Sequence, residues 1–208
     1  MEVLNIFTKD YEHIGIATRE ETHRYGYWHE VFHCWVLERI NEQWHIYLQL
    51  RSKLKKDNPR QFDITAAGHL MSDETVKDGI REMKEELGLQ VDFNDLHPLG
   101  IIPYKIENAS IKDFEFAHVF LYTVENGFAQ FKIQEIELDG IYRLPLEQFI
   151  QLGNGVLKQV TIEGYEVINK EKIFEQKVIT LADMETLPSI YQMPLIAKIN
   201  SWMEKRDR

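Results

Sequence analysis

Residues 67–89 read AGHLMSDETVKDGIREMKEELGL. Apolar side chains recur in this stretch at the three- and four-residue spacing of an amphipathic helix, at Val76, Ile80, Met83 and Leu87. Gly88 follows directly, and glycine commonly ends a helix because it accepts a left-handed backbone. The stretch therefore predicts a helix that begins near Thr75 and stops before Gly88.

The opposite face of this predicted helix is acidic. It carries four carboxylates, Asp78, Glu82, Glu85 and Glu86. Like charges at helical spacing repel one another, so a cation on this face would stabilise it. Mg²⁺ takes oxygen ligands and commonly shares its coordination shell with substrate phosphates. A metal site is one interpretation of the face, and a solvated acidic surface is the other.

Composition excludes several classes of protein. The 208 residues include 24 Lys and Arg against 34 Asp and Glu, a net charge of −10, which disfavours binding to a nucleic-acid polymer. The single cysteine, Cys34, excludes an internal disulfide framework and fits a reducing compartment. The sequence shows neither a signal peptide nor an apolar run of about 18 residues. We therefore expect a cytoplasmic protein that does not enter a membrane.

The rest of the chain alternates strand-like runs with turn residues. Strands are predicted at residues 3–7, 31–37, 44–50, 98–106 and 114–124, with loops at 38–43 and 52–61. Residues 160–167, VTIEGYEV, suggest a hairpin turning at Glu163-Gly164, and residues 194–205 suggest a second helix. The prediction is a mixed α/β (α+β) fold, with residues 1–150 as the main domain and 151–208 as a C-terminal elaboration packed on it.

Residues 81–89 carry a more specific pattern, R-E-U-x-E-E-x-G-U, where U is apolar. The pattern resembles the Nudix box, the signature of hydrolases that cleave nucleoside and other organic diphosphates. Gly68 matches the glycine that opens the box. The spacing before Arg81 is one residue shorter than the family's, so either Glu74 or Asp73 takes the place of the loop acid.

The resemblance implies a role for each matching residue. It implies a mixed β-sheet sandwiched by helices, Mg²⁺ (or Mn²⁺) held by Glu82, Glu85 and Glu86, and a diphosphate cleaved by metal-activated water. Gly68, Glu74, Arg81 and Gly88 would be structural residues of the box. Glu137 resembles a downstream catalytic glutamate that serves as general base, and Glu135 is its rival.

A second resemblance covers roughly residues 20–145. HRYGYWHEVFHCWVL at 23–37, LQLRSKLKK and DITAAGH are similar to the Nudix branch that includes isopentenyl-diphosphate isomerase. That branch implies a second metal site at positions matching His23, His29, His69, Asp113 and Glu115. The isomerase cysteine is replaced by Ala67, whose methyl group cannot exchange a proton, so isomerisation is disfavoured.

Basic residues follow the strand predicted at 44–50. Arg51 and Lys55 are candidates to bind substrate phosphates, and a solvated loop is the alternative. The leading hypothesis is a Mg²⁺-dependent Nudix hydrolase acting on a small-molecule diphosphate. An isomerase-like enzyme and a non-catalytic sensor of a phosphorylated metabolite are the alternatives. The predicted edge strands and apolar C-terminal helix also suggest a homodimer.

Overall fold

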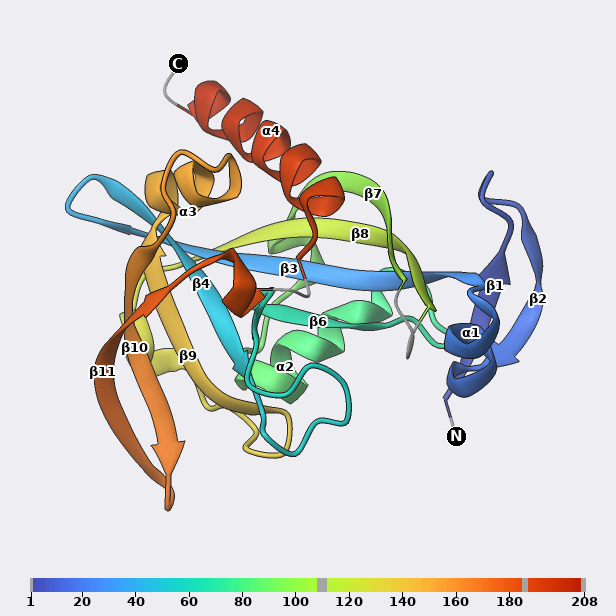
Figure 1. Ribbon diagram of the computed structural model, residues 1–208, viewed down its shortest axis with the longest axis horizontal. Coiled ribbons are helices and arrows are strands. Elements are labelled where there is room, and N and C mark those ends of the chain that lie inside the picture. The colour runs from blue at the N-terminus through green and yellow to red at the C-terminus, as the bar shows by residue number, and fades with distance from the viewer. Residues whose placement is uncertain (1, 108–111, 185–186, 207–208) are drawn as a thin grey trace.

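Strand β3 (Trp28–Ile40) lies at the centre of the fold. In the computed structural model, which describes residues 2–107, 112–184 and 187–206, β3 pairs in parallel with β8 (Lys112–Val124). Its other partners, β1 (Val3–Phe7), β4 (Gln43–Arg51) and β6 (Ala66–His69), are antiparallel (Figure 1). One strand therefore organises both sides of the sheet.

The other strands extend this network at its edges. From β4 the order continues through β9 (Leu138–Pro145), β10 (Val160–Ile168) and β11 (Glu171–Ile179). The remaining strands are β2 (His13–Thr18) beside β1, β5 (Phe62–Asp63) beside β4, and β7 (His97–Glu107) beside β8. The five strands predicted from the sequence are all present, several of them longer than predicted.

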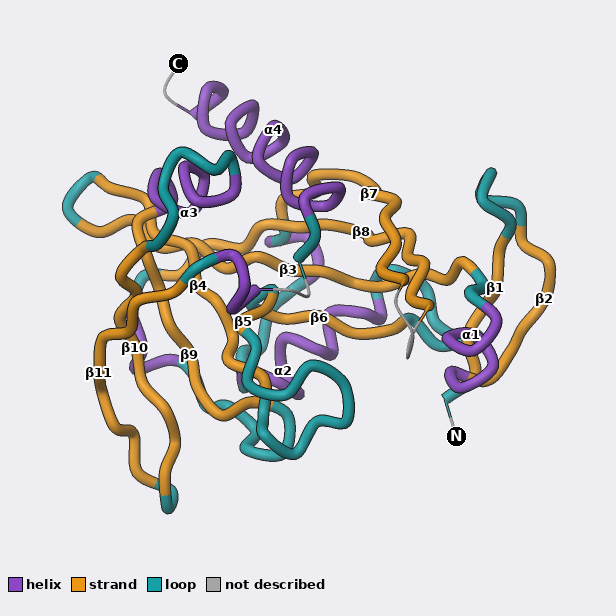
Figure 2. The backbone as a smooth tube through the Cα atoms, in the orientation of Figure 1, coloured by secondary structure: helices purple, strands orange, loops and turns teal. Residues whose placement is uncertain are grey.

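The sheet is covered by helices on both faces (Figures 1 and 2). The helices are α1 (Arg19–Tyr25), α2 (Arg81–Leu87), α3 (Leu146–Gly153) and α4 (Ser189–Arg206), with short 3-10 turns at Asp78–Ile80, Phe93–Asp95, Gly127–Gln130 and Leu181–Met184. Successive residues of β3 alternate between two cores, as the pleat of a strand requires. Val31 and Trp35 pack with α3 and α4, and Phe32 and Cys34 pack with α2. The predicted sheet sandwiched by helices is therefore confirmed.

Helix α2 is shorter than predicted. Its α-helical part begins at Arg81, after the 3-10 turn, and not near Thr75. The Asp78 carboxylate accepts hydrogen bonds from the backbone N–H and the hydroxyl of Thr75, so it caps the preceding turn and does not join the glutamates of α2. Gly88 ends the helix as predicted, in the left-handed region at φ 70°.

The hairpin predicted to turn at Glu163-Gly164 is wrong. Residues Val160–Ile168 form one continuous strand, and the turn lies at Asn169 and Lys170, both with positive φ. Gly164 sits inside β10 because the neighbouring strand comes very close there. A Cβ at this position would lie 2.2 Å from the carbonyl oxygen of Ile141. The glycine therefore marks a close backbone approach and not a turn.

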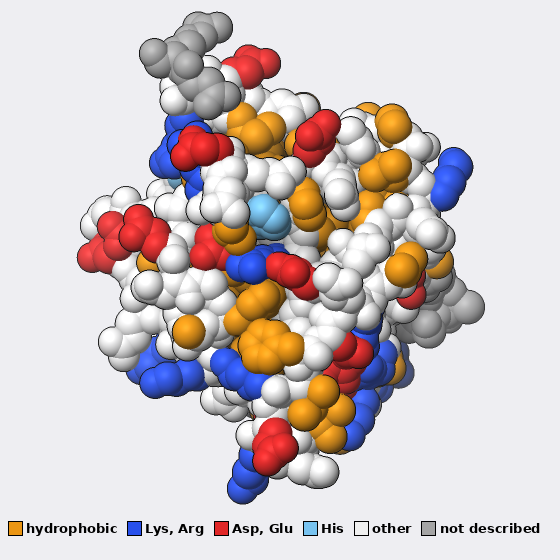
Figure 3. Space-filling model, turned by 90° about the vertical axis from the view of Figure 1, so that its left-hand side faces the viewer, with side chains coloured by type: hydrophobic (Ala, Val, Ile, Leu, Met, Phe, Trp, Pro, Cys, Tyr) orange, Lys and Arg blue, Asp and Glu red, His pale blue; other side chains and the backbone are white. Residues whose placement is uncertain are grey.

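The C-terminal segment completes the sheet and one core. Strand β10 pairs with β9, and α4 starts at Ser189, five residues before the predicted start at Pro194. The helix buries a row of side chains against the sheet, Tyr191, Leu195, Ile196, Ile199 and Trp202. Strand β11 lies at the end of the strand order and exposes Ile173, Phe174 and Val178. On this side of the molecule hydrophobic side chains lie among charged ones (Figure 3).

None of the helices in the described residues combines the length and the apolar character needed to cross a bilayer.

Candidate active site

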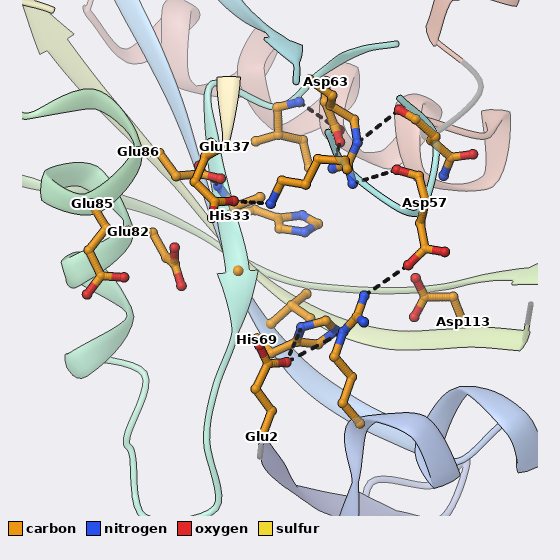
Figure 4. Close-up of a pocket in the computed structure, with 18 of the residues that line it drawn as sticks. Glu2, His33, Asp57, Asp63, His69, Glu82, Glu85, Glu86, Asp113 and Glu137 are labelled. Atoms are coloured by element: carbon orange, nitrogen blue, oxygen red, sulfur yellow. Dashed lines mark hydrogen bonds and ion pairs between the residues drawn. The ribbon is translucent and has the colours of Figure 1, made fainter. Parts of the chain in front are cut away.

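A cavity of about 660 Å³ opens beside β3 and β6. Glu82, Glu85 and Glu86 of α2 reach it from one side, and His69 and Asp113 lie across from them (Figure 4). The loop 52–61 contributes further lining residues, as do Gln134, Ile136 and Glu137. The fold thus brings the box glutamates and the predicted histidine site to a single cavity.

The box glutamates are unequally exposed. Glu82 and Glu86 are buried, whereas Glu85 is exposed. Burial raises the pKa of Glu82 to about 7, and burial together with the nearby charge of Glu82 raises the pKa of Glu86 well above its ordinary value. Each buried carboxylate is therefore costly to ionise beside the other, which is the electrostatic condition that a bound cation relieves.

Glu86 is held in place by two donors. Its Oε2 accepts a hydrogen bond from the backbone N–H of Ala67 at 3.0 Å and one from the Gln49 amide at 3.3 Å. The oxygen that receives these bonds comes from a helix, and the donors come from β6 and β4. This fixes the side chain of Glu86 at the junction of helix and sheet, with its carboxylate lining the cavity.

Arg81 binds the loop that precedes the helix. Its guanidinium donates to both oxygens of Glu74, at 2.6 and 3.2 Å, and to the carbonyl oxygen of His69 at 3.0 Å. It also pairs with Glu82 and Glu85. Of the two candidates for the loop acid, Glu74 makes the contact with Arg81, and Asp73 is exposed. The ion pair between Arg81 and Glu74 therefore joins the helix to the loop, although the box is one residue shorter than the family's.

Gly68 allows Glu82 to reach its position. A Cβ on Gly68 would lie 2.1 Å from Oε1 of Glu82. Any side chain there would displace the carboxylate, so the glycine is required for close packing of β6 against α2. Its neighbour in the chain, Ala67, is the residue whose N–H holds Glu86.

Glu137 and Lys55 form an ion pair at the rim of the cavity (Figure 4). Glu137 lines the cavity, and its negative charge contributes to the raised pKa of both Glu82 and Glu86. Glu135 is exposed and is not among the lining residues. This geometry favours Glu137 over its rival.

The guanidinium of Arg51 lines the cavity but is already used by the protein. It donates to Asp63 at 3.0 Å and to the carbonyl oxygens of Asp57 and Asn58 at 3.0 and 3.2 Å. These contacts shape the loop 52–61. A role in binding phosphate stays a prediction for both Arg51 and Lys55. Lys55 makes an ion pair with Glu137, whose side chain is 35% exposed.

Four of the five residues predicted for the second metal site come together. One ligand atom from each of His23, His29, His69 and Asp113 lies within 4.8 Å of the others. The Nδ1–H group of His29 donates to the carbonyl oxygen of Tyr27 at 3.1 Å. The lone pair of Nε2 is therefore available to bind a metal.

The donor atoms of this group face one another, with Nε2 of His23 and of His29 lying 3.4 and 3.5 Å from Oδ1 of Asp113. Among the described residues, Nε2 of each of the three histidines and Oδ1 of Asp113 are buried without a hydrogen bond. Burial lowers the pKa of His29, and burial together with neighbouring His29 lowers that of His69 further. Neutral imidazoles beside a carboxylate suit a divalent cation, so the residues fit a metal.

Glu115 lies outside this group. Its Oε2 faces Nε2 of His33 at 3.7 Å. His33, Gln49, Asp63 and Tyr104 also line or support the cavity, and no site role was predicted for His33, Gln49 or Asp63. A sequence signal existed for His33, because alternate residues of a strand share a face and His33 is four residues from His29.

The comparisons with known proteins agree with this arrangement. The NUDIX domain family matches residues 17–163. The chain belongs to the Nudix family. An uncharacterized Nudix hydrolase of Clostridium acetobutylicum is 34% identical over 170 residues, which cover 82% of each chain. The family and this relative identify the protein as a hydrolase.

Two further similarities are more limited. Nudix hydrolase 3 of Arabidopsis thaliana is 29% identical over 154 residues, and the matched region spans about a fifth of that protein (20%). The crystal structure of the Deinococcus radiodurans protein DR0079 superposes with a TM-score of 0.52 at 19% identity, covering 72% of this chain and 86% of that one. At this identity the likeness concerns the fold alone.

Proposed function

We propose that this Nudix hydrolase cleaves the diphosphate bond of a small organic diphosphate and depends on Mg²⁺, or Mn²⁺ in its place, held by Glu82, Glu85 and Glu86. The observation that carries the proposal is the pair of buried carboxylates, Glu82 and Glu86, lining one cavity with Glu137. Such a cluster is stable in its ionised form only beside cations.

The residues of the chain have distinct tasks in this reaction. When bound, the metal would neutralise phosphate oxygens and make a water molecule more acidic. The Ala67 N–H and the Gln49 amide orient Glu86, and Arg81 orients Glu82. Glu137 is placed to accept a proton from water at the cavity rim. Lys55 pairs with Glu137 and is close enough to exchange that partner for a substrate phosphate.

The histidine group would hold a second divalent ion. His23, His29, His69 and Asp113 provide three imidazole nitrogens and one carboxylate, a donor set that suits Mn²⁺ or Zn²⁺ as well as Mg²⁺. Because His69 and Asp113 of this group line the same cavity as α2, a substrate anion bound at one site would lie near the other. We assign this group to binding of the substrate. Isomerisation stays disfavoured because Ala67 lacks the exchangeable proton that it requires.

The test is a hydrolysis panel with purified protein and Mg²⁺. Nucleoside, sugar, prenyl and dinucleotide diphosphates are incubated, and released phosphate or monophosphate is measured. Glu86→Gln should abolish any activity found, while Glu135→Gln, an exposed carboxylate outside the cavity, should leave it unchanged. Full activity in Glu86→Gln contradicts the metal assignment. Tight binding without turnover would favour a sensor, and deuterium incorporation into isopentenyl diphosphate would favour an isomerase.

A further inference from the structure

His33 lines the cavity and belongs to neither group of proposed metal ligands. It is 3% exposed and lines the cavity between the glutamates of α2 and His69 (Figure 4). Its cross-strand partner is Ala67, so its side chain takes up the space that the small alanine leaves. The proposed hydrolysis gives this histidine no task, although a buried polar ring is costly unless it is hydrogen-bonded.

A tyrosine of the C-terminal helix fixes the ring of His33. The hydroxyl of Tyr191 lies 3.1 Å from Nδ1 of His33 and 3.1 Å from Nε1 of Trp35. An indole N–H can only donate, so the tyrosine oxygen accepts that bond. The hydroxyl's own hydrogen is then available to Nδ1 of His33, and we take that bond as the one that orients the ring. Burial lowers the pKa of His33 to about 3, and the neutral ring therefore carries its proton on Nε2.

The Nε2–H group of His33 faces an oxygen of Glu115 that can accept a further hydrogen bond. Oε2 of Glu115 is 3.7 Å away, which is too far for a hydrogen bond. Glu115 is 7% exposed, and within the described part of the chain this oxygen has no hydrogen-bond partner. A donor and an acceptor are thus held side by side in the cavity wall with neither one satisfied by the protein.

We propose that His33, positioned by Tyr191, is a specificity-determining residue that, with Glu115, binds a hydroxyl group on the organic part of the diphosphate substrate. The proposal rests on the proposed function and names the class of substrate within it. A hydroxyl can accept from Nε2–H and donate to Oε2 at once, which suits two groups that do not reach each other. A plain hydrocarbon group would bury both without a partner.

The proposal excludes one substrate class from the panel. Diphosphates whose organic part is purely hydrocarbon, such as prenyl diphosphates, should be poor substrates. Diphosphates of hydroxylated groups, such as sugars and nucleosides, should be good ones. A site built to hydrogen-bond a substrate hydroxyl rejects the analogue that lacks it far more strongly than an apolar pocket rejects an added methylene.

The experiment compares linear alkyl diphosphates of increasing chain length, each paired with its terminal hydroxyl analogue. For the wild-type enzyme with Mg²⁺, we expect kcat/KM to favour the hydroxyl member by about 10- to 100-fold at the chain length that reaches His33. Hydrolysis at similar rates for both members at every length overturns the proposal and leaves the proposed function intact.

Variants separate recognition from folding. His33→Leu should bring the ratio within each pair close to one, whereas His33→Gln, which keeps an amide donor near the Nε2 position, should retain most of it. Tyr191→Phe should also lower the ratio of kcat/KM within each pair, because it removes the hydroxyl that orients His33, although Tyr191 itself does not contact the substrate. The control is Tyr165→Phe, a fully buried tyrosine outside the cavity lining whose hydroxyl has no partner in the described residues. An unchanged ratio in His33→Leu contradicts the proposal.

A failure of the proposed function can be distinguished from a failure of the recognition site. If the wild-type enzyme hydrolyses none of these compounds, the same pairs are compared by calorimetric dissociation constants in Mg²⁺. Tighter binding of the hydroxyl member that is lost in His33→Leu then supports the recognition site by itself, and equal binding of both members overturns it.

Discussion

Glu166 connects the loop at the cavity to the C-terminal hairpin, and replacing it with glutamine removes its charge at nearly constant size. Its two carboxylate oxygens accept from Arg60 at 2.7 and 2.8 Å, and Lys177 and Tyr142 also contact it. Arg60 belongs to the loop 52–61, which carries Lys55, and Glu166 belongs to β10.

The expected loss of folding stability follows from the pKa of Glu166. The hydrogen bonds from Arg60 lower the pKa of Glu166 from its ordinary value of 4.5 to about 2. A difference of this size corresponds to about 3 kcal/mol. Because the Arg60 side chain is 42% exposed, solvent screens the pair, and we expect about 1–2 kcal/mol. A carboxyl group with a depressed pKa stabilises the fold above its unfolded pKa, so this contribution is lost as the pH falls from about 4.5 towards 2.

Urea denaturation followed by tryptophan fluorescence measures the effect. Glu166→Gln should lower the free energy of unfolding by about 1–2 kcal/mol at neutral pH, and the difference from wild type should shrink as the pH falls below about 4.5. Glu171→Gln, an exposed carboxylate at the start of β11, is the control and should change little. A loss of stability that is the same at every pH would refute the reasoning, because it would not come from the ionised carboxylate.

Three further predictions concern close packing and the histidine group. Gly68→Ala should lower kcat about 10- to 100-fold with little change in melting temperature, because its Cβ displaces only the mobile end of Glu82. Gly164→Ala should lower the free energy of unfolding in urea by roughly 1–3 kcal/mol or more, since its Cβ meets backbone atoms of β9 that cannot move away. Asp113→Asn should weaken Mn²⁺ binding, measured by calorimetry, about 10- to 100-fold, because it removes the one carboxylate of the group.

Sequence reasoning was most accurate where the signal is local. The spacing of apolar residues and the terminal glycine located α2, because both act within a few turns of one helix. Glycine itself is ambiguous: Gly88 ends a helix, whereas Gly164 lies inside a strand beside Ile141. Nothing in the residues next to Gly164 distinguishes a turn from a close approach, so the hairpin was misplaced.

The parts of the site that depend on distant contacts could not be predicted. Tyr191 meets His33 across 158 positions of sequence, and the pattern at residues 23–37 that contains His33 gives no sign of a partner in the C-terminal helix. The choice between Glu135 and Glu137 required their exposure, which follows from the fold of a loop. The roles of the site residues, the homodimer and the cytoplasmic location stay predictions.

Helix α4 lies beyond residue 163, where the match to the family ends, yet it supplies the hydroxyl that orients a residue lining the cavity. In the proposed function, the glutamates that act on the diphosphate and the helix that positions His33 therefore belong to separate parts of the chain. Substitutions in the last helix can retune which compounds are accepted while the box stays unaltered. A protein engineer seeking new substrates should accordingly diversify the helix surface around Tyr191 before changing any glutamate of α2.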